Sequence, residues 1–305
     1  MRKTATYRNK KNKIRLRSSD LFMQIFVITL VVILLIVVMY PLIYVLSCSI
    51  SDSQAVNSGK VILWPIGFSL NGYKLVFSYK KIWVGYANTI FYTVVGTLLN
   101  LVLTTCAAYP LSRKFFGHKF VMTLFLIIMF FSGGMIPNYI LMSNLHLTNT
   151  RWAVLLSGAL SVYNMIIMRT FFQNSIPRDL LEAAKIDGIT DIGYLLRIVI
   201  PLSKAIFAVI TLYYAVAHWN SYFSAMLYLR KPELYPLQMV LRSILNAGKI
   251  DPGEMDDPEM LRMLLESQDL MKYALMIVSS LPLLVAYPFV QKFFKKGVMI
   301  GSVKG

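Results

Sequence analysis

The sequence predicts an all-α integral membrane protein with six transmembrane helices. Hydrophobic residues make up 57% of its 305 residues and charged residues only 15%, whereas soluble domains have about 45–50% and about 25%. Lys, Arg, Asp and Glu are absent from six long stretches, each of which can supply the roughly 17–25 apolar residues that a helix needs to cross a bilayer. Helices are expected because a chain in lipid must satisfy its own backbone. The stretches are residues 21–51, 82–112, 120–150, 152–168, 205–229 and 273–291.

The distribution of charge predicts the orientation of these helices. If the N-terminus is cytoplasmic and the helices alternate, the inner segments hold most of the 31 lysines and arginines, and the outer segments hold most of the 14 acidic residues. This agrees with the positive-inside rule, so both termini are expected in the cytoplasm. Residues 1–20 then form a basic cytoplasmic arm against anionic lipid. Residues 21–305 form one membrane domain with an inner loop, 169–204, and an outer loop, 230–272.

Two parts of this domain depart from a simple bundle. The third stretch is interrupted by residues 132–134 and Pro137, and a broken membrane helix is tolerated where it is buried in protein or lines a wet cavity. The outer loop contains an acidic stretch, 251–269, interrupted by Met and Leu. Two interpretations of that stretch stay open: a solvated surface loop, and a docking element for an external partner.

The sequence lacks the residues that several classes of function require. The spans contain no charged residue of the kind an ion-coupled secondary carrier uses, and His218 is better explained as an interfacial anchor than as a proton relay. His118, His146 and His218 fall on different sides of the membrane, so no metal site is expected. No phosphate-binding loop or catalytic set is present, so the chain is expected to bind no cofactor and not to be an enzyme. The net charge of +17 is explained by topology, without a nucleic-acid partner.

If the chain moves a solute uphill, the energy must come from a partner protein. The inner loop contains a candidate contact for such a partner. A short helix is predicted from Pro177, whose φ suits a first turn, and Asp179 complements the positive N-terminal dipole. Gly188 supplies the left-handed residue that ends the helix. Ala183 and Ala184 leave a small-residue face that another protein can approach closely.

A second short helix follows, with Thr190 as its expected N-cap. Pro201 then redirects the chain into the fifth transmembrane helix. Two amphipathic helices therefore protrude at the inner face, and one of them is joined directly to a spanning helix, which is a suitable shape for a mechanical lever. The apolar face of the second helix is predicted, at i, i+3, i+4 and i+7, to be Ile192, Leu195, Leu196 and Val199.

This loop resembles the signature of permease subunits of binding-protein-dependent ABC importers. The motif reads Glu182-Ala183-Ala184, three residues, Gly188, nine residues, then Ile198-Val199-Ile200-Pro201. Ile200 stands where Leu is usual, and Trp219-Asn220 matches a family feature that is normally followed by an acid rather than by Ser221. Residues 63–73, 168–172 and 296–305 resemble the carbohydrate-uptake branch of the family, and residues 131–137 its complex-polysaccharide permeases.

The resemblance implies a type I ABC importer transmembrane domain with cytoplasmic coupling helices, in the bacterial cytoplasmic membrane. It implies a second homologous permease in a heterodimer, two ATPase subunits that hold ATP and Mg²⁺, and an extracytoplasmic sugar-binding lipoprotein. Such a permease moves oligosaccharides by alternating access. The implied ATPase-coupling residues are Glu182, Ala183, Ala184, Asp187, Gly188, Ile198 and Pro201. In a maltose-importing member the tail reaches the ATPase dimer interface, so Lys304 and Gly305 are implied contacts as well.

Solute contacts are expected from aromatic rings and amide groups in a mostly apolar pocket. Tyr and Asn in membrane helices also serve as packing contacts between helices, and in the maltose importer the sugar site lies in the other permease subunit. Both interpretations therefore stay open for the candidates, beside the alternatives of an ion-coupled secondary carrier or a membrane scaffold. The candidates are Asn100, Tyr109, Tyr163, Asn164, Tyr213 and Asn220.

Overall fold

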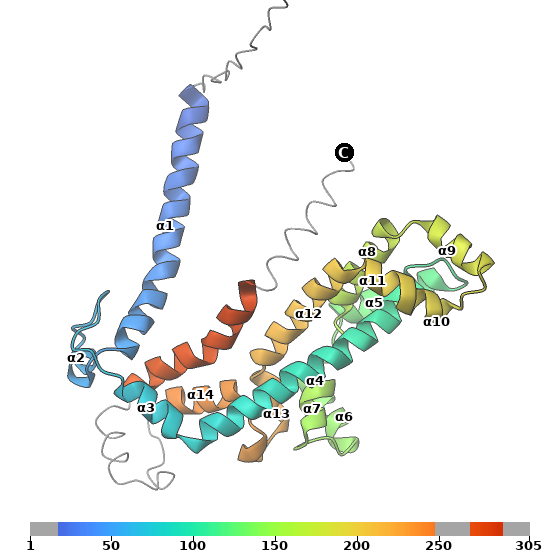
Figure 1. The fold of residues 1–305 in the computed structure, drawn as a ribbon. Helices are drawn as coiled ribbons and strands as arrows, with labels where there is room; N and C mark the ends of the chain where they lie inside the picture. The colour runs from blue at the N-terminus through green and yellow to red at the C-terminus, as the bar shows by residue number, and fades with distance from the viewer. Residues whose placement is uncertain (1–17, 248–268, 289–305) are drawn as a thin grey trace, which may run out of the picture.

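The computed structural model describes residues 18–247 and 269–288, and every regular element in these ranges is helical (Figure 1). Most of the basic arm, nearly all of the acidic stretch 251–269 and the whole tail with Lys304 and Gly305 lie outside the described residues. The elements in chain order are α1 (Ser18–Ser49), α2 (Ser53–Asn57), α3 (Asn71–Ser78), α4 (Lys80–Leu111), α5 (His118–Phe130), α6 (Met135–Asn144), α7 (Arg151–Leu156), α8 (Val162–Ser175), α9 (Arg178–Ile186), α10 (Asp191–Tyr194), η1 (Leu195–Val199), α11 (Ile200–Leu202), α12 (Lys204–Trp219), α13 (Phe223–Tyr228), η2 (Pro232–Leu234), α14 (Leu237–Ala247) and a last helix, Asp269–Pro288.

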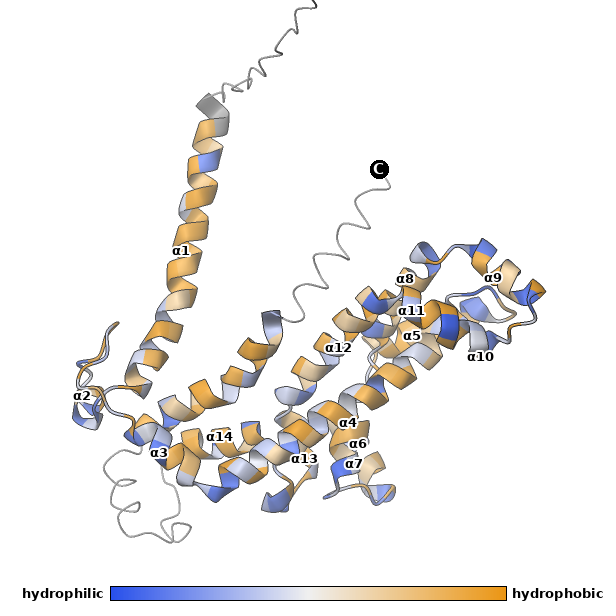
Figure 2. Ribbon diagram, in the orientation of Figure 1, coloured by the Kyte–Doolittle hydropathy of each residue, from blue (hydrophilic) through white to orange (hydrophobic). Residues whose placement is uncertain are grey.

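α1 stands apart from the other described helices (Figure 1). It is hydrophobic along nearly its whole length (Figure 2), and none of its most apolar window is buried. Among the described residues it packs on the rest of the chain near its end, where Tyr44 and Cys48 join a small cluster with Leu270. The next segment folds back there, since Ser47 Oγ donates to the carbonyl of Leu63 at 2.6 Å. A helix that is apolar all round fits lipid or another membrane chain.

α4 is the central element of the fold. It makes its most extensive contacts with α12, followed by α8 and α14. Its 32 residues give it a length of about 48 Å. The close approach of α12 depends on Gly96, because a Cβ added there would lie 2.4 Å from Nε2 of His218. A glycine at this point therefore allows the histidine ring to lie directly on the backbone of α4.

Three helices in the described ranges are each long and apolar enough to cross a membrane: α1 from Leu21, α4 and Asp269–Pro288. Two pairs meet that test only together, namely α5 with α6, bent by 111°, and Asp191–Leu202 with α12, bent by 84°. The first bend lies at the interruption predicted at residues 132–134, which is confirmed.

The fourth predicted span, 152–168, is wrong as a single helix. It forms α7 and α8, joined through Gly158 at a φ of +87°. α8 has only 14 residues, fewer than the roughly 20 that span a bilayer. Within the fifth uncharged stretch, 205–229, α12 ends at Trp219 and the short α13 follows it.

Candidate functional site

The first helix of the inner loop, α9, has the predicted ends. Asp179 lies in its first turn, and Gly188 has a φ of +72°, which confirms the left-handed stop. Pro177 lies one position earlier than expected, as the N-cap rather than in the first turn, with Arg178 the first helical residue. The change is small because a fixed φ suits either place. Asp187 is the C-cap: its N–H donates to the carbonyl of Ala183, and the N–H of Gly188 donates to that of Lys185.

α9 packs on the body of the protein through Ala184 and the partly buried Leu181. Ala184 is buried in the largest hydrophobic cluster, with Met168 and Tyr194. The other motif residues of this helix, Glu182, Ala183, Asp187 and Gly188, are exposed. At its end Ile186 is 87% exposed, so this end of the helix presents an apolar side chain at the surface. The helix is thus seated by Ala184 and Leu181 and leaves the remaining motif free for a partner.

The second helix of the loop has the predicted cap but a different apolar face. Thr190 Oγ1 accepts from the N–H of Gly193 at 3.1 Å, which confirms the cap. Val199 is 1% exposed and Leu195 packs against the large cluster, as predicted, whereas Ile192 and Leu196 are 71% and 57% exposed, so half of the predicted apolar face is wrong. The reason is that η1 is a π-helix, whose wider turn places residues five apart on one side. Tyr194 and Val199, five apart, are the buried pair.

The bend into α12 follows the loop motif. Ile198 packs against the large cluster, and Pro201 is exposed in α11. The chain turns by 84° at Ser203, two residues after Pro201. The loop helix is thus joined to α12 by a single non-helical residue, so the direct connection predicted for a lever is present.

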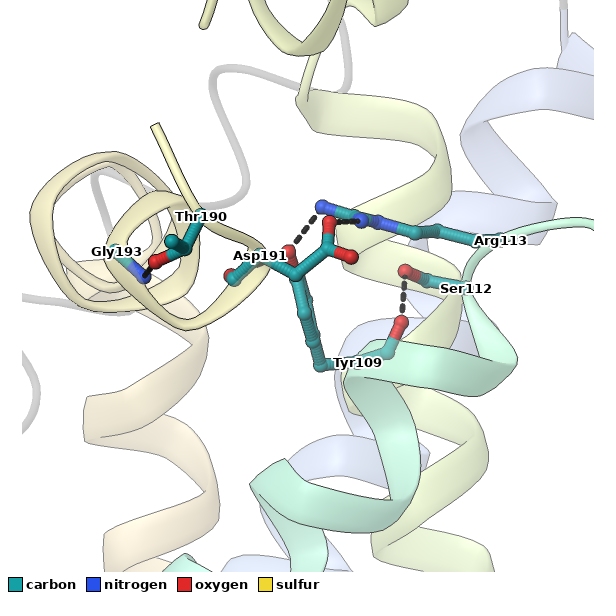
Figure 3. A network of polar contacts seen from close by, with 6 residues as sticks. All are labelled: Tyr109, Ser112, Arg113, Thr190, Asp191 and Gly193. Atoms are coloured by element: carbon teal, nitrogen blue, oxygen red, sulfur yellow. Dashed lines mark hydrogen bonds and ion pairs between the residues drawn. The ribbon is translucent and has the colours of Figure 1, made fainter. Parts of the chain in front are cut away.

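A network of polar contacts joins this loop to the end of α4 (Figure 3). The Arg113 guanidinium forms an ion pair with the Asp191 carboxylate and donates to the Tyr109 hydroxyl. Tyr109 Oη donates to the backbone carbonyl of Asp191 at 3.0 Å. The guanidinium also lies 4.3 Å from the ring centre of Tyr109 and 5.2 Å from that of Tyr194. Beside this network lies a cavity of about 890 Å³ between α4, α8, α9 and α10, the loop cavity.

A second cavity, the membrane pocket, lies between α4, α8, α12 and α13. Its volume is about 480 Å³, within the range usual for ligand sites. Four of the six solute candidates line it: Asn100, Asn164, Tyr213 and Asn220. The other lining residues are Val154, Ser157, Gly158, Ser161, Tyr214, Ala217, His218, Ser221, Tyr222, Phe223 and Ser224.

The remaining solute candidates lie elsewhere. Tyr109 lines the loop cavity and binds the loop backbone. Tyr163 is 56% exposed and does not line the membrane pocket. The structure therefore gathers one subset of the candidates and separates these two from it.

Hydrogen bonds hold the wall of the membrane pocket in place. His218 and Asn100 lie 3.1 Å apart, nitrogen to amide. The amide orientation that satisfies every polar group lets Asn100 accept from Nε2–H and donate to the carbonyls of Gly96 and Ala159 at 2.9 and 3.2 Å. The Tyr214 hydroxyl bonds Thr104 Oγ1 at 2.6 Å. His218 is buried in this network, so its expected role as an interfacial anchor is wrong.

Ser221 is the other pocket residue that sequence reasoning missed. Its Oγ is buried and has no hydrogen-bond partner among the described residues. A buried polar atom without a partner costs about 1–3 kcal/mol. The signal in the sequence was the serine that stands where the family has an acid.

Comparison with known proteins agrees with the loop signature. Residues 82–300 match the model of the family described as binding-protein-dependent transport system inner membrane component. The chain is 41% identical over 266 residues to the polygalacturonan/rhamnogalacturonan transport system permease protein YtcP of Bacillus subtilis (strain 168), covering 87% of this chain and 92% of that protein. It is 39% identical to protein LplC of the same organism, over 87% of this chain and 89% of LplC.

A solved structure has the same fold. It is that of a bacterial ABC transporter involved in the import of the acidic polysaccharide alginate. The two chains superpose with a TM-score of 0.84 at 35% identity, covering 92% of this chain and 99% of the other.

Proposed function

Since the chain belongs to the binding-protein-dependent transport system inner membrane component family, we propose that its membrane pocket is the solute pathway and its inner loop the ATPase contact. The chain is a permease subunit of an oligosaccharide ABC importer, a transport component rather than an enzyme. It resides in the membrane and works with an ATPase and a substrate-binding protein.

One observation carries the assignment of the solute pathway. Asn100, Asn164, Tyr213 and Asn220, selected for amide and aromatic chemistry, converge from three segments of the chain on one pocket. The unpartnered Ser221 Oγ lies in the same wall. Amides, hydroxyls and aromatic rings around a mostly apolar cavity suit a sugar, whose ring has hydroxyl edges and apolar faces.

We propose further that the solute contains uronic acid units. YtcP is named for polygalacturonan and rhamnogalacturonan, and the alginate importer for an acidic polysaccharide. The residues that line the membrane pocket include no Asp or Glu, so no fixed negative charge among them repels a carboxylate. Uptake of trigalacturonate and maltotriose into proteoliposomes tests this. Trigalacturonate is expected to be transported and maltotriose not to compete; the reverse result would reject the uronate assignment.

A pair of tyrosines tests the pocket itself. Tyr213→Ala removes a ring from the pocket, and Tyr163→Ala removes an exposed ring on α8 that does not line it. Tyr213→Ala is expected to raise the solute concentration for half-maximal uptake about tenfold, equivalent to about 1.4 kcal/mol of binding. Tyr163→Ala should leave it within about twofold. Equal effects of the two substitutions would show that the pocket is not the pathway.

The partners are proposed from the exposed surfaces. α1, unburied along its apolar window, fits lipid and a second homologous permease in a heterodimer, and an extracytoplasmic lipoprotein would deliver the sugar. Two ATPase subunits, which would hold ATP and Mg²⁺, would meet the exposed end of α9 at Ile186. Both termini are then cytoplasmic, and the ATPase contact of Lys304 and Gly305 stays a prediction.

The ATPase contact is tested by copurification. Ile186→Asp places a charge on the exposed apolar end of α9, and desolvating that charge at an interface is unfavourable. ATPase subunits are expected to be lost from the complex. Ile62→Asp, at an exposed apolar residue of the segment after α2, is the matched control and should retain them. Full retention of the ATPase with Ile186→Asp would argue against this contact.

A further inference from the structure

The end of α4 is held from two sides. On one side Arg113 and Tyr109 bind the side chain and the backbone carbonyl of Asp191, the first residue of α10 (Figure 3). On the other side α8 caps the last carbonyls of α4. Arg169 Nε donates to the carbonyl of Leu111 at 2.7 Å, and Gln173 Nε2 donates to that of Ser112 at 3.2 Å. Cations and amide donors are favourable at a helix C-terminus, which has unpaired carbonyls and a negative dipole end.

These contacts place the end of α4 across the base of the inner loop. α8 leads into α9, and α10 leads through η1 and α11 into α12. The end of α4 thus binds the helix that enters the loop and the helix that leaves it. A movement of α9 and α10 as a unit changes the position of α4 as long as the contacts with Asp191 persist.

The opposite end of α4 carries a second anchor of different character. Asn88 Nδ2 donates to the carbonyls of Glu233 and Tyr235 at 2.7 and 3.1 Å. Thr89 Oγ1 accepts from the N–H of Leu237 at 2.8 Å. Tyr92 Oη donates to the carbonyl of Leu234 at 2.9 Å.

The two anchors differ in burial. Asn88, Thr89 and Tyr92 are buried, so their bonds to residues 233–237 are costly to break. The Asp191 side chain is 70% exposed, and an exposed ion pair contributes little to folding. The inner anchor, or joint, is therefore the weaker of the two, because it combines the buried Tyr109 with an ion pair exposed to water.

We propose that α4 is a rigid link that passes displacement of the inner loop to the segment 233–237, with Arg113 and Tyr109 as the positioning residues of the joint. The two anchors lie on one unbroken helix, Asn88 and Tyr109 being separated by roughly 30 Å. The inference rests on the proposed function, in which the inner loop is the ATPase contact. Because linkage is reciprocal, a partner bound at residues 233–237 would also bias the loop.

Charge reversal at the joint tests the first half of this proposal. The complex, purified through this chain and reconstituted in proteoliposomes, is assayed for ATP hydrolysis and for uptake of trigalacturonate. Arg113→Asp and Asp191→Arg are each expected to lower uptake per ATP about tenfold while hydrolysis persists, and the double reversal should recover most of it. Lys114→Asp is the control, because it reverses the charge of the next residue, which also lines the loop cavity. Its uptake per ATP should stay within about twofold of wild type.

The outcomes separate the two hypotheses. A wild-type complex that hydrolyses ATP without uptake of trigalacturonate or any other oligosaccharide contradicts the proposed function. A wild-type complex that transports, with single reversals that keep its uptake per ATP, overturns the joint. A double reversal no better than the single ones overturns it as well, because it would show that Arg113 and Asp191 do not act as a pair.

Labelling of the far anchor tests the second half. Glu233→Cys, at an exposed side chain, is placed in a chain with Cys48 and Cys106 replaced by alanine, and its reaction with a membrane-impermeant maleimide is timed in the complex with and without Mg·ATP. Mg·ATP is expected to change the labelling rate of the Glu233→Cys chain severalfold. When Arg113→Asp is added to that chain, the labelling rate should be the same with and without Mg·ATP. A labelling rate of the Glu233→Cys chain that does not change with Mg·ATP, or an equal response in the Arg113→Asp chain, would overturn transmission through α4.

Discussion

The inner loop and the membrane pocket are built in opposite ways. The loop is one continuous run of chain, from Pro177 to Pro201, whose turns and caps are set by neighbouring residues. The pocket is assembled from α4, α8, α12 and α13, and its walls meet only because those helices pack. Altering the loop should therefore impair function and leave the fold intact. Altering the pocket wall should impair the fold first.

The largest expected effect is at Gly188. Gly188→Val forces a β-branched residue to a φ of +72°, which costs about 1–3 kcal/mol of local strain. No atom of the described residues lies within 4 Å of the added Cβ, so the strain acts on the shape of the loop. ATP-driven uptake should fall at least about tenfold while membrane insertion and thermal stability persist. Uptake is measured on the reconstituted complex, thermal stability on the purified complex and insertion in the membrane fraction.

Gly59→Val is the matched control for Gly188→Val. Gly59 has a φ of +67° and open space around its Cβ position, but it lies in the segment after α2. It should suffer the same local strain and retain uptake. Unchanged uptake with Gly188→Val, or equal loss with Gly59→Val, would remove the special role assigned to the loop.

The next effect concerns the pocket wall and should appear as lost stability. Gly96→Ala places a methyl group 2.4 Å from Nε2 of His218, and overpacking of this kind costs about 1–3 kcal/mol. The complex should unfold at a lower Tm. Gly133→Ala, whose nearest contact would be 3.8 Å away, should leave the Tm unchanged. Equal Tm values for the two variants would show that α12 does not pack on α4 as described.

The smallest effect is expected at the cap of the second loop helix. Thr190→Ala removes the acceptor of the Gly193 N–H, which typically costs about 1 kcal/mol. Because the loss is local, amide hydrogen exchange in residues 191–199 should accelerate severalfold while the Tm of the complex barely changes. Thr123→Ala removes only a bond to the carbonyl of Lys119 within α5 and is the control. Unaltered exchange in the Thr190 variant would show that this cap does not hold the loop helix.

Prediction from sequence succeeded where the deciding interactions are local. The end of α9 at Gly188 follows from backbone conformation, and the N-cap at Thr190 follows from a hydrogen bond over a few residues. It failed in part around η1, where Leu195 and Val199 pack as predicted but Ile192 and Leu196 are exposed, because a π-turn changes the spacing on which the apolar face was predicted. The fourth span failed for a related reason: an uncharged stretch indicates membrane depth but not where Gly158 divides the helix.

The solute candidates show most clearly what could not be predicted from the sequence. Asn100 and Tyr109 lie on the same helix and were selected by the same chemistry, yet one lines the membrane pocket and the other binds the inner loop. Position along α4 separates them. Their partners, His218 and Asp191, lie far along the chain, so spacing in the sequence could not reveal either pairing.

The sequence by itself determined the membrane class, the spans at α1, α4 and Asp269–Pro288, the broken third helix and the loop motif, because composition and short-range backbone chemistry act within a few turns of chain. The tertiary structure alone decided which polar residues share a pocket, why His218 is buried against Gly96, and how α4 binds the inner loop at one end and residues 233–237 at the other. Asn100 and His218 are 118 positions apart, and contacts across such separations depend on how whole helices pack.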